Sequence, residues 1–585
     1  MRGFQDKVSF IWSIADLLRG DYKQSEYGKV ILPFTVLRRC GELPRTPGNF
    51  AQHLKKLRAD LCEILDCFRF RETTARLQKA GLLALILERF AGIDLDPASV
   101  SNHEMGYIFE ELIRKFSEQS NETAGEHFTP REVVRLMVRL CFQDDWGAGK
   151  TLYDPACGTG GMLAAAEEYA RERYPDARLE IAGQELNAES YAMCKADALL
   201  RGHSAGSIAL GNSFTHDAFA GRKFDYILSN PPFGVDWRKV EKQVRAEQER
   251  LGFHGRFGAG LPRVNDGSLL FLQHMLSKMK PEGTRIAVVF NGSPLFTGDA
   301  GSGESEIRRW IFENDWLEAV IALPDRLFYN TGLATYIWLV TNNKSPARQG
   351  KVQLINAADF YEKMTPSLGA KRNQISAPHI DRICEIHRGF ADGAYSRILS
   401  NRELGYRRVT IERPMRLRFQ VAPERIPVLQ NKFAPPVIRA LAEMDAHAVY
   451  RDQSIFDAAL QAAFARSGLR FGRTIARRIR EALGEQDDTA AIYRDAKNRP
   501  IPDSDLRDNE DVPLDEDLQS WFKREVLPHA PDAWIAAGEP RVGYAIPFAR
   551  FFFKPEAVRP LAEIDREIQE LEREAQSLLR QFGTP

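Results

Sequence analysis

The segment Asn230-Pro231-Pro232-Phe233 carries an amide, two prolines and an aromatic ring directly after an apolar run that predicts a buried strand. Since the prolines fix φ and lack N–H groups, the strand must end there. The amide and a carbonyl oxygen can accept hydrogen bonds from an exocyclic amine, and the ring can stack on a planar base. This chemistry suits methyl transfer to a flipped nucleobase. In isolation, a plain strand-ending Pro-Pro loop explains the segment better.

A second group of candidate residues lies in a glycine-rich turn that follows a predicted strand. Glycines let a backbone approach a ligand closely, so the turn resembles a nucleotide-binding loop. It lacks the spacing of a dinucleotide fingerprint and the lysine of a Walker motif. The candidate ligand-binding residues here are Asp154, Gly158, Thr159, Gly160 and Gly161.

Two further polar residues follow predicted strands. Glu185 comes after a strand predicted over residues 179–183, where an acidic side chain commonly binds ribose hydroxyls; an ordinary surface carboxylate is the alternative. Asn212 follows a strand predicted over residues 207–210. Ligands of open α/β sheets bind outside the carboxyl ends of the strands. We therefore expect Asp154, Glu185, Asn212 and Asn230 to converge on one edge of the sheet.

A helix start precedes the glycine-rich turn. Thr129 is a suitable N-cap, Pro130 suits the first helical position, and Glu132 follows the threonine by three residues. Capping alone explains this pattern as well as ligand binding does, and the two are compatible because a helix N-terminus also binds carboxylates. The candidate binding residues of this segment are Glu126, His127, Phe128, Thr129, Pro130 and Arg131.

The elements that must position these residues alternate between strands and helices. Helices are predicted over 162–173, 188–200, 269–279 and 305–312, and further strands over 285–290, 317–323 and 335–341. This alternation predicts a mostly parallel, doubly wound α/β sheet. Residues 1–124 instead have helical apolar periodicity and predict a packed helical domain. Residues 235–267 predict a flexible, mildly basic loop over the mouth of the site, which either contacts phosphate or is simply solvated.

The composition is that of an ordinary globular protein, with 44% hydrophobic and 27% charged residues. The 80 basic and 80 acidic side chains cancel, so contacts with nucleic acid must come from local patches or from a partner. Seven scattered cysteines predict free thiols, and no signal segment or membrane-spanning run is found, so we expect a cytoplasmic protein. The spacing of Cys and His predicts no metal site.

The C-terminal third contains two patterns. Residues 464–483 hold six arginines and one acidic residue, which is typical of a solvated helix face and compatible with a phosphate-binding patch. Farther on, apolar residues recur at spacings of three and four. They predict a short heptad seam that either folds back on its own domain or, as we favour, binds a partner helix. The seam comprises Leu561, Ile564, Ile568, Leu571, Ala575, Leu578 and Phe582.

Taken in order, three motifs resemble those of N6-adenine DNA methyltransferases: His127-Phe128-Thr129-Pro130, Asp154-Pro155-Ala156-Cys157-Gly158-Thr159-Gly160-Gly161 and Asn230-Pro231-Pro232-Phe233. More narrowly, the chain is similar to the modification (M) subunits of type I restriction–modification systems, with support from residues 12–37, 266–275 and 317–331. The resemblance implies a helical N-terminal domain (1–124), a Rossmann-like methyltransferase domain (125–345), a mixed region (346–555) and a C-terminal helical tail (556–585).

The resemblance also implies S-adenosylmethionine (AdoMet) as the cofactor. Phe128 and Thr129 would hold its methionine part, and Asp154 and the glycine-rich turn would line the same ligand. Glu185 would bind the ribose hydroxyls. Asn212 would lie near the cofactor's adenine, at a position where the related motif often has an acidic residue.

For the target, the resemblance implies that Asn230 and the carbonyl of Pro231 accept hydrogen bonds from an adenine amine, and that Phe233 stacks on the flipped base in double-stranded DNA. A separate specificity subunit would bind the C-terminal helix and choose the DNA sequence, and a restriction subunit would accompany them. One alternative is methylation of another planar amine, such as cytosine N4, an RNA base or a glutamine amide. Another is a catalytically silent scaffold that still binds AdoMet.

Overall fold

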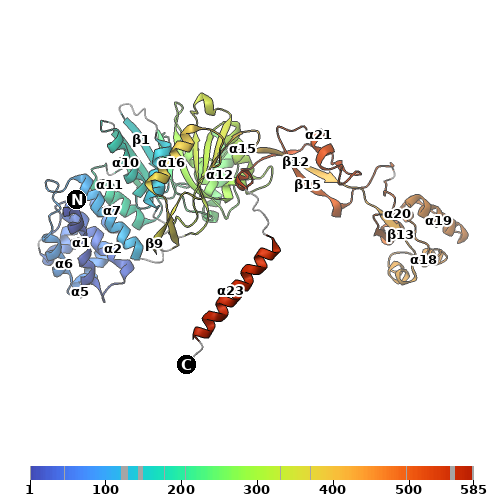
Figure 1. Cartoon of the computed structure of the whole chain (residues 1–585), viewed down its shortest axis with the longest axis horizontal. Helices are drawn as coiled ribbons and strands as arrows, with labels where there is room; N and C mark the ends of the chain where they lie inside the picture. Colours follow the sequence, from blue (N-terminus) through green and yellow to red (C-terminus); the bar gives the residue numbers. More distant parts are fainter. Residues whose placement is uncertain are drawn as a thin grey trace.

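The computed structural model describes residues 2–44, 46–119, 129–142, 149–176, 178–204, 206–329, 331–368, 370–495, 497–553 and 560–582. It begins with a domain of packed helices, as predicted, drawn in blue in Figure 1. These are α1 (Arg2–Leu18), α2 (Tyr27–Arg39), α3 (Phe50–Leu54), α4 (Ala59–Cys67), α5 (Phe70–Lys79), α6 (Leu83–Ala91) and α7 (Asn102–Gln119).

Helix α2 forms the centre of this domain, because nearly every side chain along it is buried. Its Phe34 ring lies among those of Phe50, Phe70 and Phe90, at centroid distances of 5.9, 5.0 and 5.5 Å. Each such aromatic pair adds roughly 0.5–1.5 kcal/mol to the stabilisation from buried area. The aromatic cluster therefore links α2 to α3, α5 and α6.

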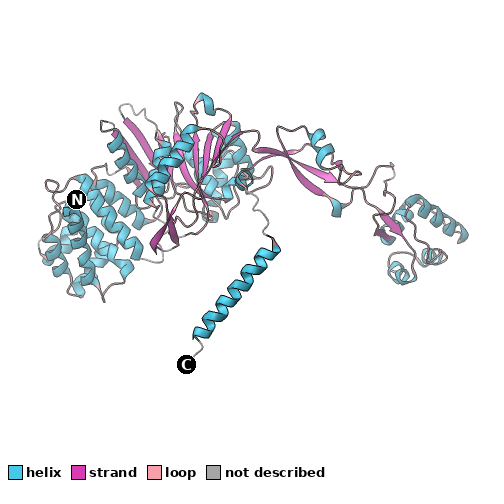
Figure 2. Cartoon of the chain, in the orientation of Figure 1, coloured by secondary structure: helices cyan, strands magenta, loops and turns pink. Residues whose placement is uncertain are grey.

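The following part of the chain builds a large sheet, whose strands are drawn in magenta in Figure 2. Its strand order is β11-β8-β6-β7-β5-β4-β1-β2-β3. From β3 to β5 neighbouring strands are parallel, whereas β7 and β11 run antiparallel to their neighbours. The mostly parallel α/β sheet is thus confirmed. The strands are β1 (Gly149–Asp154), β2 (Arg178–Glu185), β3 (Ile208–Leu210), β4 (Tyr226–Ser229), β5 (Arg285–Asn291), β6 (Leu317–Ala322), β7 (Thr335–Thr341), β8 (Lys351–Asn356) and β11 (Ser396–Ser400).

Helices cover both faces of this sheet. On one face, α9 (Arg131–Cys141), α10 (Gly161–Arg173) and α16 (Ala377–Gly389) share a hydrophobic core with the strands. On the other, α13 (Ser268–Leu276) and α15 (Gly303–Glu313) do the same. Because both faces are covered, the central strands are apolar runs rather than alternating ones, as in β6, where every residue is buried.

Helix α11 (Ala188–Leu200) joins the helical domain to the sheet. Its Ala192, Ala196 and Leu200 lie in the core of the N-terminal helices. The ammonium group of Lys195, which is buried, donates to the carboxylate of Glu63 on α4 at 2.6 Å. Since α11 follows β2 directly, the helical domain is held beside the carboxyl end of that strand.

The sheet continues beyond residue 345, the expected end of the catalytic domain. β8 pairs parallel with β6, and β11 pairs antiparallel with β8. Residues 351–356 and 396–400 therefore extend one edge of the central sheet and belong to it structurally. The boundary at residue 345 itself stays a prediction.

A second sheet follows, in which β12 (Gly405–Glu412) pairs with β15 (Asp508–Pro513), β16 (Trp534–Ile535) and β17 (Arg541–Tyr544). Helix α21 (Leu518–Glu525) packs on it through Trp521 and Phe522. Tyr544 attaches this sheet to the body, because its ring stacks on Phe312 of α15 at 5.3 Å.

Residues 414–502, which we call the distal module, are inserted between β12 and β15. The module has its own core, in which Phe419 stacks on Phe456 at 4.6 Å, and a bridge between Pro414 and Pro502 closes its base. Figure 1 shows it in orange, beyond the second sheet. Its elements are β13 (Leu417–Phe419), α17 (Ile426–Gln430), α18 (Pro435–Ala442), α19 (Gln453–Arg466), α20 (Arg473–Leu483) and β14 (Gly484–Gln486).

The chain's last described element is α23 (Leu561–Phe582), drawn in red in Figure 1. Among the side chains of its predicted seam that the structure describes, Leu561 is 78% exposed, Ile568 49% and Leu571 63%. A membrane-spanning helix, long and apolar enough to cross a bilayer, does not occur in the described part of the chain.

Candidate functional site

A cavity of about 650 Å³ lies at the carboxyl ends of β1, β2 and β4, beside the point where the strand order reverses. Cofactor pockets typically have volumes of roughly 300–1,000 Å³. The expected convergence on one sheet edge is present in the structure. The predicted residues that line the cavity are Thr129, Asp154, Gly158, Thr159, Gly161, Glu185, Asn212, Asn230 and Pro232.

The glycine-rich turn brings backbone to one wall of this cavity. Gly158 and Gly160 have φ values of +55° and +88°, in the left-handed region that favours glycine. A Cβ atom on Gly160 would lie 2.8 Å from the sulfur of Cys194 on α11, so only glycine fits between the turn and that helix. Gly161 then begins α10, which places the start of a helix at the cavity wall.

Asp154 ends β1 and is almost completely buried. One of its carboxylate oxygens accepts hydrogen bonds from the Ala156 amide at 3.0 Å and from the Ser229 hydroxyl at 2.8 Å. Burial nevertheless raises the pKa of Asp154 to about 7, with a smaller contribution from the negative charge of Glu185. This carboxyl group therefore changes its charge near neutral pH.

Glu185 ends β2 and holds the glycine-rich turn in place. One carboxylate oxygen accepts from the Gly158 amide at 2.8 Å, and the other from the Asn187 amide at 2.7 Å. A carboxylate has about four acceptor sites, so two remain for a ligand in the cavity. Glu185 thus fixes the turn and retains acceptors that face the cavity. Within the described residues there is no cluster of three or more His, Cys, Asp or Glu side chains suited to a metal ion.

Asn212 lies on the opposite wall, just after β3. Its side-chain oxygen accepts from the Phe214 amide at 2.8 Å, which folds the backbone into a tight turn. The neighbouring Ser213 hydroxyl donates to the carbonyl of Pro155 at 2.6 Å. The bond between Ser213 and Pro155 ties the segment after β3 to the segment after β1, whereas the bond between Asn212 and Phe214 shapes the turn itself.

Asn230 follows β4 and carries the least satisfied polar atom of the cavity. Its side-chain nitrogen donates to the hydroxyl of Thr129 at 3.0 Å. Its side-chain oxygen is buried and has no hydrogen-bond partner among the described residues. Because a buried acceptor without a donor costs roughly 1–3 kcal/mol, the fold maintains this oxygen at a free-energy cost. The arrangement is suited to accepting a hydrogen bond from a ligand's N–H.

The remaining predicted residues lie away from the cavity wall. Phe233 packs its ring at a steep angle to that of Phe328, with the centroids 5.9 Å apart, so its stacking on a base stays a prediction. Pro231 is buried at the end of β4, and Pro130 is buried at the start of α9. Arg131 forms an ion pair with Glu110 at 2.9 Å. The expected ligands Glu126, His127 and Phe128 lie outside the described residues.

Several cavity residues were missed from sequence. Phe214 and Phe271 form an apolar wall, with their ring centroids 4.5 Å apart. Leu186, next to Glu185, is 66% exposed at the cavity although it is large and apolar. An apolar residue directly after a strand-ending carboxylate was an available signal for this position. Phe271 gave no such signal, because it lies on a uniformly apolar helix.

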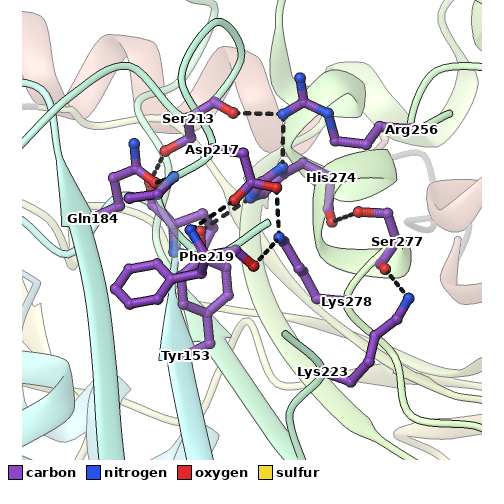
Figure 3. A network of polar contacts seen from close by, with 12 residues as sticks. Tyr153, Gln184, Ser213, Asp217, Phe219, Lys223, Arg256, His274, Ser277 and Lys278 are labelled. Atoms are coloured by element: carbon purple, nitrogen blue, oxygen red, sulfur yellow. Dashed lines mark hydrogen bonds and ion pairs between the residues drawn. The ribbon is translucent and has the colours of Figure 1, made fainter. Parts of the chain in front are cut away.

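A network of polar contacts supports this wall from behind (Figure 3). Arg256 donates to the carbonyls of Ser213 and Phe214, both at 2.6 Å, and forms an ion pair with Glu247 at 2.6 Å. Its guanidinium also contacts Nδ1 of His274 at 3.1 Å. Arg256 therefore holds two consecutive backbone carbonyls of the cavity wall.

His274 extends the network toward β1. Burial and the charges of Arg256 and Lys278 lower the pKa of His274 well below its usual range, so the ring is neutral. Since Nδ1 faces the Arg256 donor, we assign the ring proton to Nε2, which lies 3.0 Å from the Tyr153 hydroxyl. Tyr153, His274 and Arg256, all labelled in Figure 3, are thus joined by successive polar contacts.

The segment 235–267, expected to be a flexible loop, is folded. It contains α12 (Glu241–Leu251), and its Trp237, Val244 and Phe257 are buried in the core of the sheet face. Only Val235 from this segment lines the cavity. The prediction of a flexible loop was wrong because these buried side chains are too widely spaced in the sequence to form a recognisable apolar pattern.

Comparisons with known proteins match two parts of the chain. Residues 100–404 match the family model described as N-6 DNA Methylase, and residues 7–136 match the HsdM N-terminal domain. The type I restriction enzyme MjaIX methylase subunit of Methanocaldococcus jannaschii is 29% identical over 325 residues, covering 55% of each chain. The HindI methylase subunit of Haemophilus influenzae is 29% identical over 257 residues, covering 43% of this chain and 54% of its own.

The chain thus aligns with about half the length of these curated relatives. A solved structure, the methyltransferase subunit of a type I restriction-modification system from Streptococcus thermophilus, aligns with a TM-score of 0.54 at 20% identity. The alignment covers 68% of this chain and 96% of that one. It shows that the helical domain and central sheet together form a known fold.

Proposed function

This chain belongs to the N-6 DNA methylase family, and on that basis we propose that it methylates the N6 amine of adenine in DNA with AdoMet as the methyl donor. We propose further that it acts as the modification subunit of a type I restriction–modification complex. The observation that carries the proposal is the buried, unpartnered side-chain oxygen of Asn230, which faces a cavity with a carboxylate and an apolar wall.

The residues of the cavity fit AdoMet. Glu185 retains acceptors for two ribose hydroxyls, and Leu186, Phe214 and Phe271 offer apolar surface to a planar base. Thr129, at the start of α9, is placed to hold the amino-acid end of the cofactor, as the family resemblance implies. When bound, AdoMet supplies an electrophilic methyl group on a positively charged sulfur.

The protein's part in the transfer is to orient the amine. The lone pair of an aromatic amine is delocalised into the ring, so the nitrogen is a poor nucleophile. The side-chain oxygen of Asn230 and the carbonyl of Pro231 accept hydrogen bonds from its two N–H groups and favour a tetrahedral nitrogen. The lone pair is then available for attack, and orientation rather than a strong base accounts for the rate.

The test is the substitution Asn230→Ala. We expect loss of N6-methyladenine formation by at least about 100-fold, the scale found when one preorganised hydrogen-bond partner of a transition state is removed. Cofactor affinity, measured by isothermal titration calorimetry, should change little because the glycine-rich turn and Glu185 remain. The assay uses DNA and a cognate specificity subunit, with Asn212→Ala as a variant that perturbs the cofactor side instead. Undiminished methylation by Asn230→Ala refutes the proposal.

Mass spectrometry of the digested DNA identifies the modified nucleoside. N6-methyladenine supports the proposed substrate, whereas N4-methylcytosine with the same residue dependence assigns the site to a different amine. A flipped adenine is the expected substrate form, because a cavity of about 650 Å³ is too small for an intact duplex.

The proposed partners follow from the exposed seam of α23. An uncovered row of leucine and isoleucine on a terminal helix suits a coiled-coil contact with a specificity subunit. That subunit would choose the DNA sequence, and a restriction subunit would join the complex. We assign residues 125–345 as the catalytic domain, 346–555 as the mixed region and 556–585 as the association helix, in a cytoplasmic enzyme.

A further inference from the structure

The distal module carries a local excess of positive charge. Residues 414–502 contain 15 basic and 10 acidic side chains, a net charge of +5 in a chain whose total is zero. The excess is concentrated in one stretch. Six arginines fall between Asp457 and Glu481, and no acidic residue lies between those two positions.

Ion pairs neutralise several other charges of the module. Arg451 pairs with Asp487 at 3.0 Å, and Arg480 pairs with Asp457 at 2.5 Å. The Glu485 carboxylate forms ion pairs with both Arg418 and Arg425. Within the arginine-rich stretch, ion pairs engage Arg480 and also Arg477, which pairs with Glu481 at 3.4 Å, and the other four arginines remain.

Arg466, Arg470, Arg473 and Arg478 form what we call the arginine patch. All four are exposed, and none makes an ion pair with any residue in the described ranges. The Arg478 guanidinium donates only to the carbonyl of Lys432, at 2.8 Å. That guanidinium also lies 5.2 Å from the centre of the Phe433 ring, so Arg478 contributes to the packing of the module, whereas the like charges of the patch repel one another.

The fold holds these charges close together. Arg466 ends α19 and Arg473 begins α20, and the turn between them is closed by a hydrogen bond from the Leu469 amide to the Phe464 carbonyl at 2.9 Å. Phe471 packs against Phe464 at 5.4 Å between centroids, which turns the apolar side chains inward. Arg466, Arg470 and Arg473 are left facing solvent around a single short turn, and Arg478 follows on α20.

We propose that the arginine patch binds the phosphate backbone of double-stranded DNA outside the catalytic cavity. The guanidinium group is a planar, permanently charged donor that matches phosphate oxygens. Such contacts position a protein on a duplex without reading its sequence. This inference rests on the proposed action on DNA. It adds a second contact between the protein and DNA, separate from the catalytic cavity.

The experiment measures binding of the full chain to a random-sequence DNA duplex by fluorescence anisotropy at several KCl concentrations. The variant is R466Q/R470Q/R473Q. Each phosphate that a protein neutralises adds about 0.9 to the steepness of log K against log salt, so we expect the slope of the variant to be shallower by about 2 to 3. The charge-retaining variant R466K/R470K/R473K should keep most of the slope.

The matched control is R494Q/K497Q/R499Q, which removes the same charge from the same module. The backbone amide of Arg494 donates to the side chain of Gln453, the first residue of α19, and Arg466 is the last residue of that helix. The two sites therefore lie about 20 Å apart along the helix. An unchanged slope in R466Q/R470Q/R473Q, or an equal reduction in the control, overturns the assignment. So does tighter competition by single-stranded RNA or an acidic protein than by the duplex.

The anisotropy experiment measures DNA binding and does not depend on methylation. If the chain binds duplex through the patch but forms no N6-methyladenine, only the proposed function is refuted. If the chain forms N6-methyladenine but the salt slope of the variant is unaltered, only the role of the patch is refuted.

Discussion

Asp154 shows how burial in the cavity alters a single group. Its pKa in the folded chain, about 7, lies above the ordinary value of 3.8. The folded chain therefore keeps a proton that the unfolded chain releases between about pH 4 and 7. This contribution to the free energy of unfolding is fully present below about pH 4 and is lost as the pH rises through about 7.

Replacing Asp154 by Asn removes this titration. Between pH 4 and 7, the free energy of unfolding should fall for the parent by up to about 4 kcal/mol more than for the variant. Urea unfolding at pH 4 and pH 8 measures the difference. Other buried carboxyl groups, such as Asp197, titrate in both proteins and cancel in the comparison. Parallel pH profiles for the two chains contradict the assignment.

Arg256 acts on the cavity through backbone carbonyls rather than through a ligand. Lysine has a single charged nitrogen and cannot donate to Ser213, Phe214 and Glu247 in the same fork geometry. Arg256→Lys should weaken AdoMet binding by about 10-fold or more, the equivalent of removing one or two charge-assisted hydrogen bonds. Calorimetric titration of the full chain with AdoMet checks this.

The control for Arg256 lies in the same segment. Arg245 pairs with Glu241 at 2.8 Å on the outer side of α12, and both side chains are more exposed than those of the Arg256–Glu247 pair. Arg245→Lys should leave AdoMet affinity unchanged. An equal affinity for AdoMet in Arg256→Lys would show that the network does not position the wall.

Among the elements, the helices and strands around the cavity were the most predictable from sequence. The helix over 188–200 was predicted with the bounds the structure has, because Asn187 caps its first turn by accepting from the amides of Glu189 and Ser190. The strand before Glu185 is longer than predicted, since its outer end is polar. Strand-end polar residues could be assigned to one site because parallel strands share one carboxyl edge.

Helix α12 and the Arg256 network could not be predicted in the same way. Only Val244 of α12 is buried, so the helix has no apolar periodicity, although its Glu, Lys, Gln and Arg residues are good helix formers. The network joins positions 213, 256 and 274, which are brought together only by the folding of the sheet. Local patterns carry no information about such pairings.

Helix α23 is the element whose surface most needs a partner. Replacing Ile568 and Leu571 by Glu places two charges in the seam, so we expect loss of co-purification with the specificity subunit. The thermal unfolding of the catalytic domain should not change, because the seam contacts none of its described core clusters. Co-expression with affinity capture on the specificity subunit measures the effect.

The matched variant for the α23 seam is Glu572→Gln, on its polar flank, which should co-purify as the parent does. Retained capture by the double Glu variant would exclude this helix as the subunit contact.

At the scale of the whole molecule, the distal module was not anticipated from sequence. β12 and β15 pair through residues such as Ile411 and Asp508, which are separated by the entire module. Long-range antiparallel pairing of this kind depends on tertiary context, and loop composition does not reveal it. The arginine-rich stretch was visible in the sequence, but its lack of ion-pair partners was not.

The double connection of the distal module has a consequence for how the chain can vary. Residues 413 and 503 are joined by a backbone hydrogen bond of 2.9 Å, so the chain returns to the place from which it left. A short Asn-Gly turn can bridge antiparallel strands that end side by side. A chain in which Asn-Gly replaces residues 414–502 should fold and bind AdoMet within about two-fold of the parent, as calorimetry can establish. The distal module can therefore be gained, lost or exchanged, in evolution or by design, without altering the strand order of either sheet.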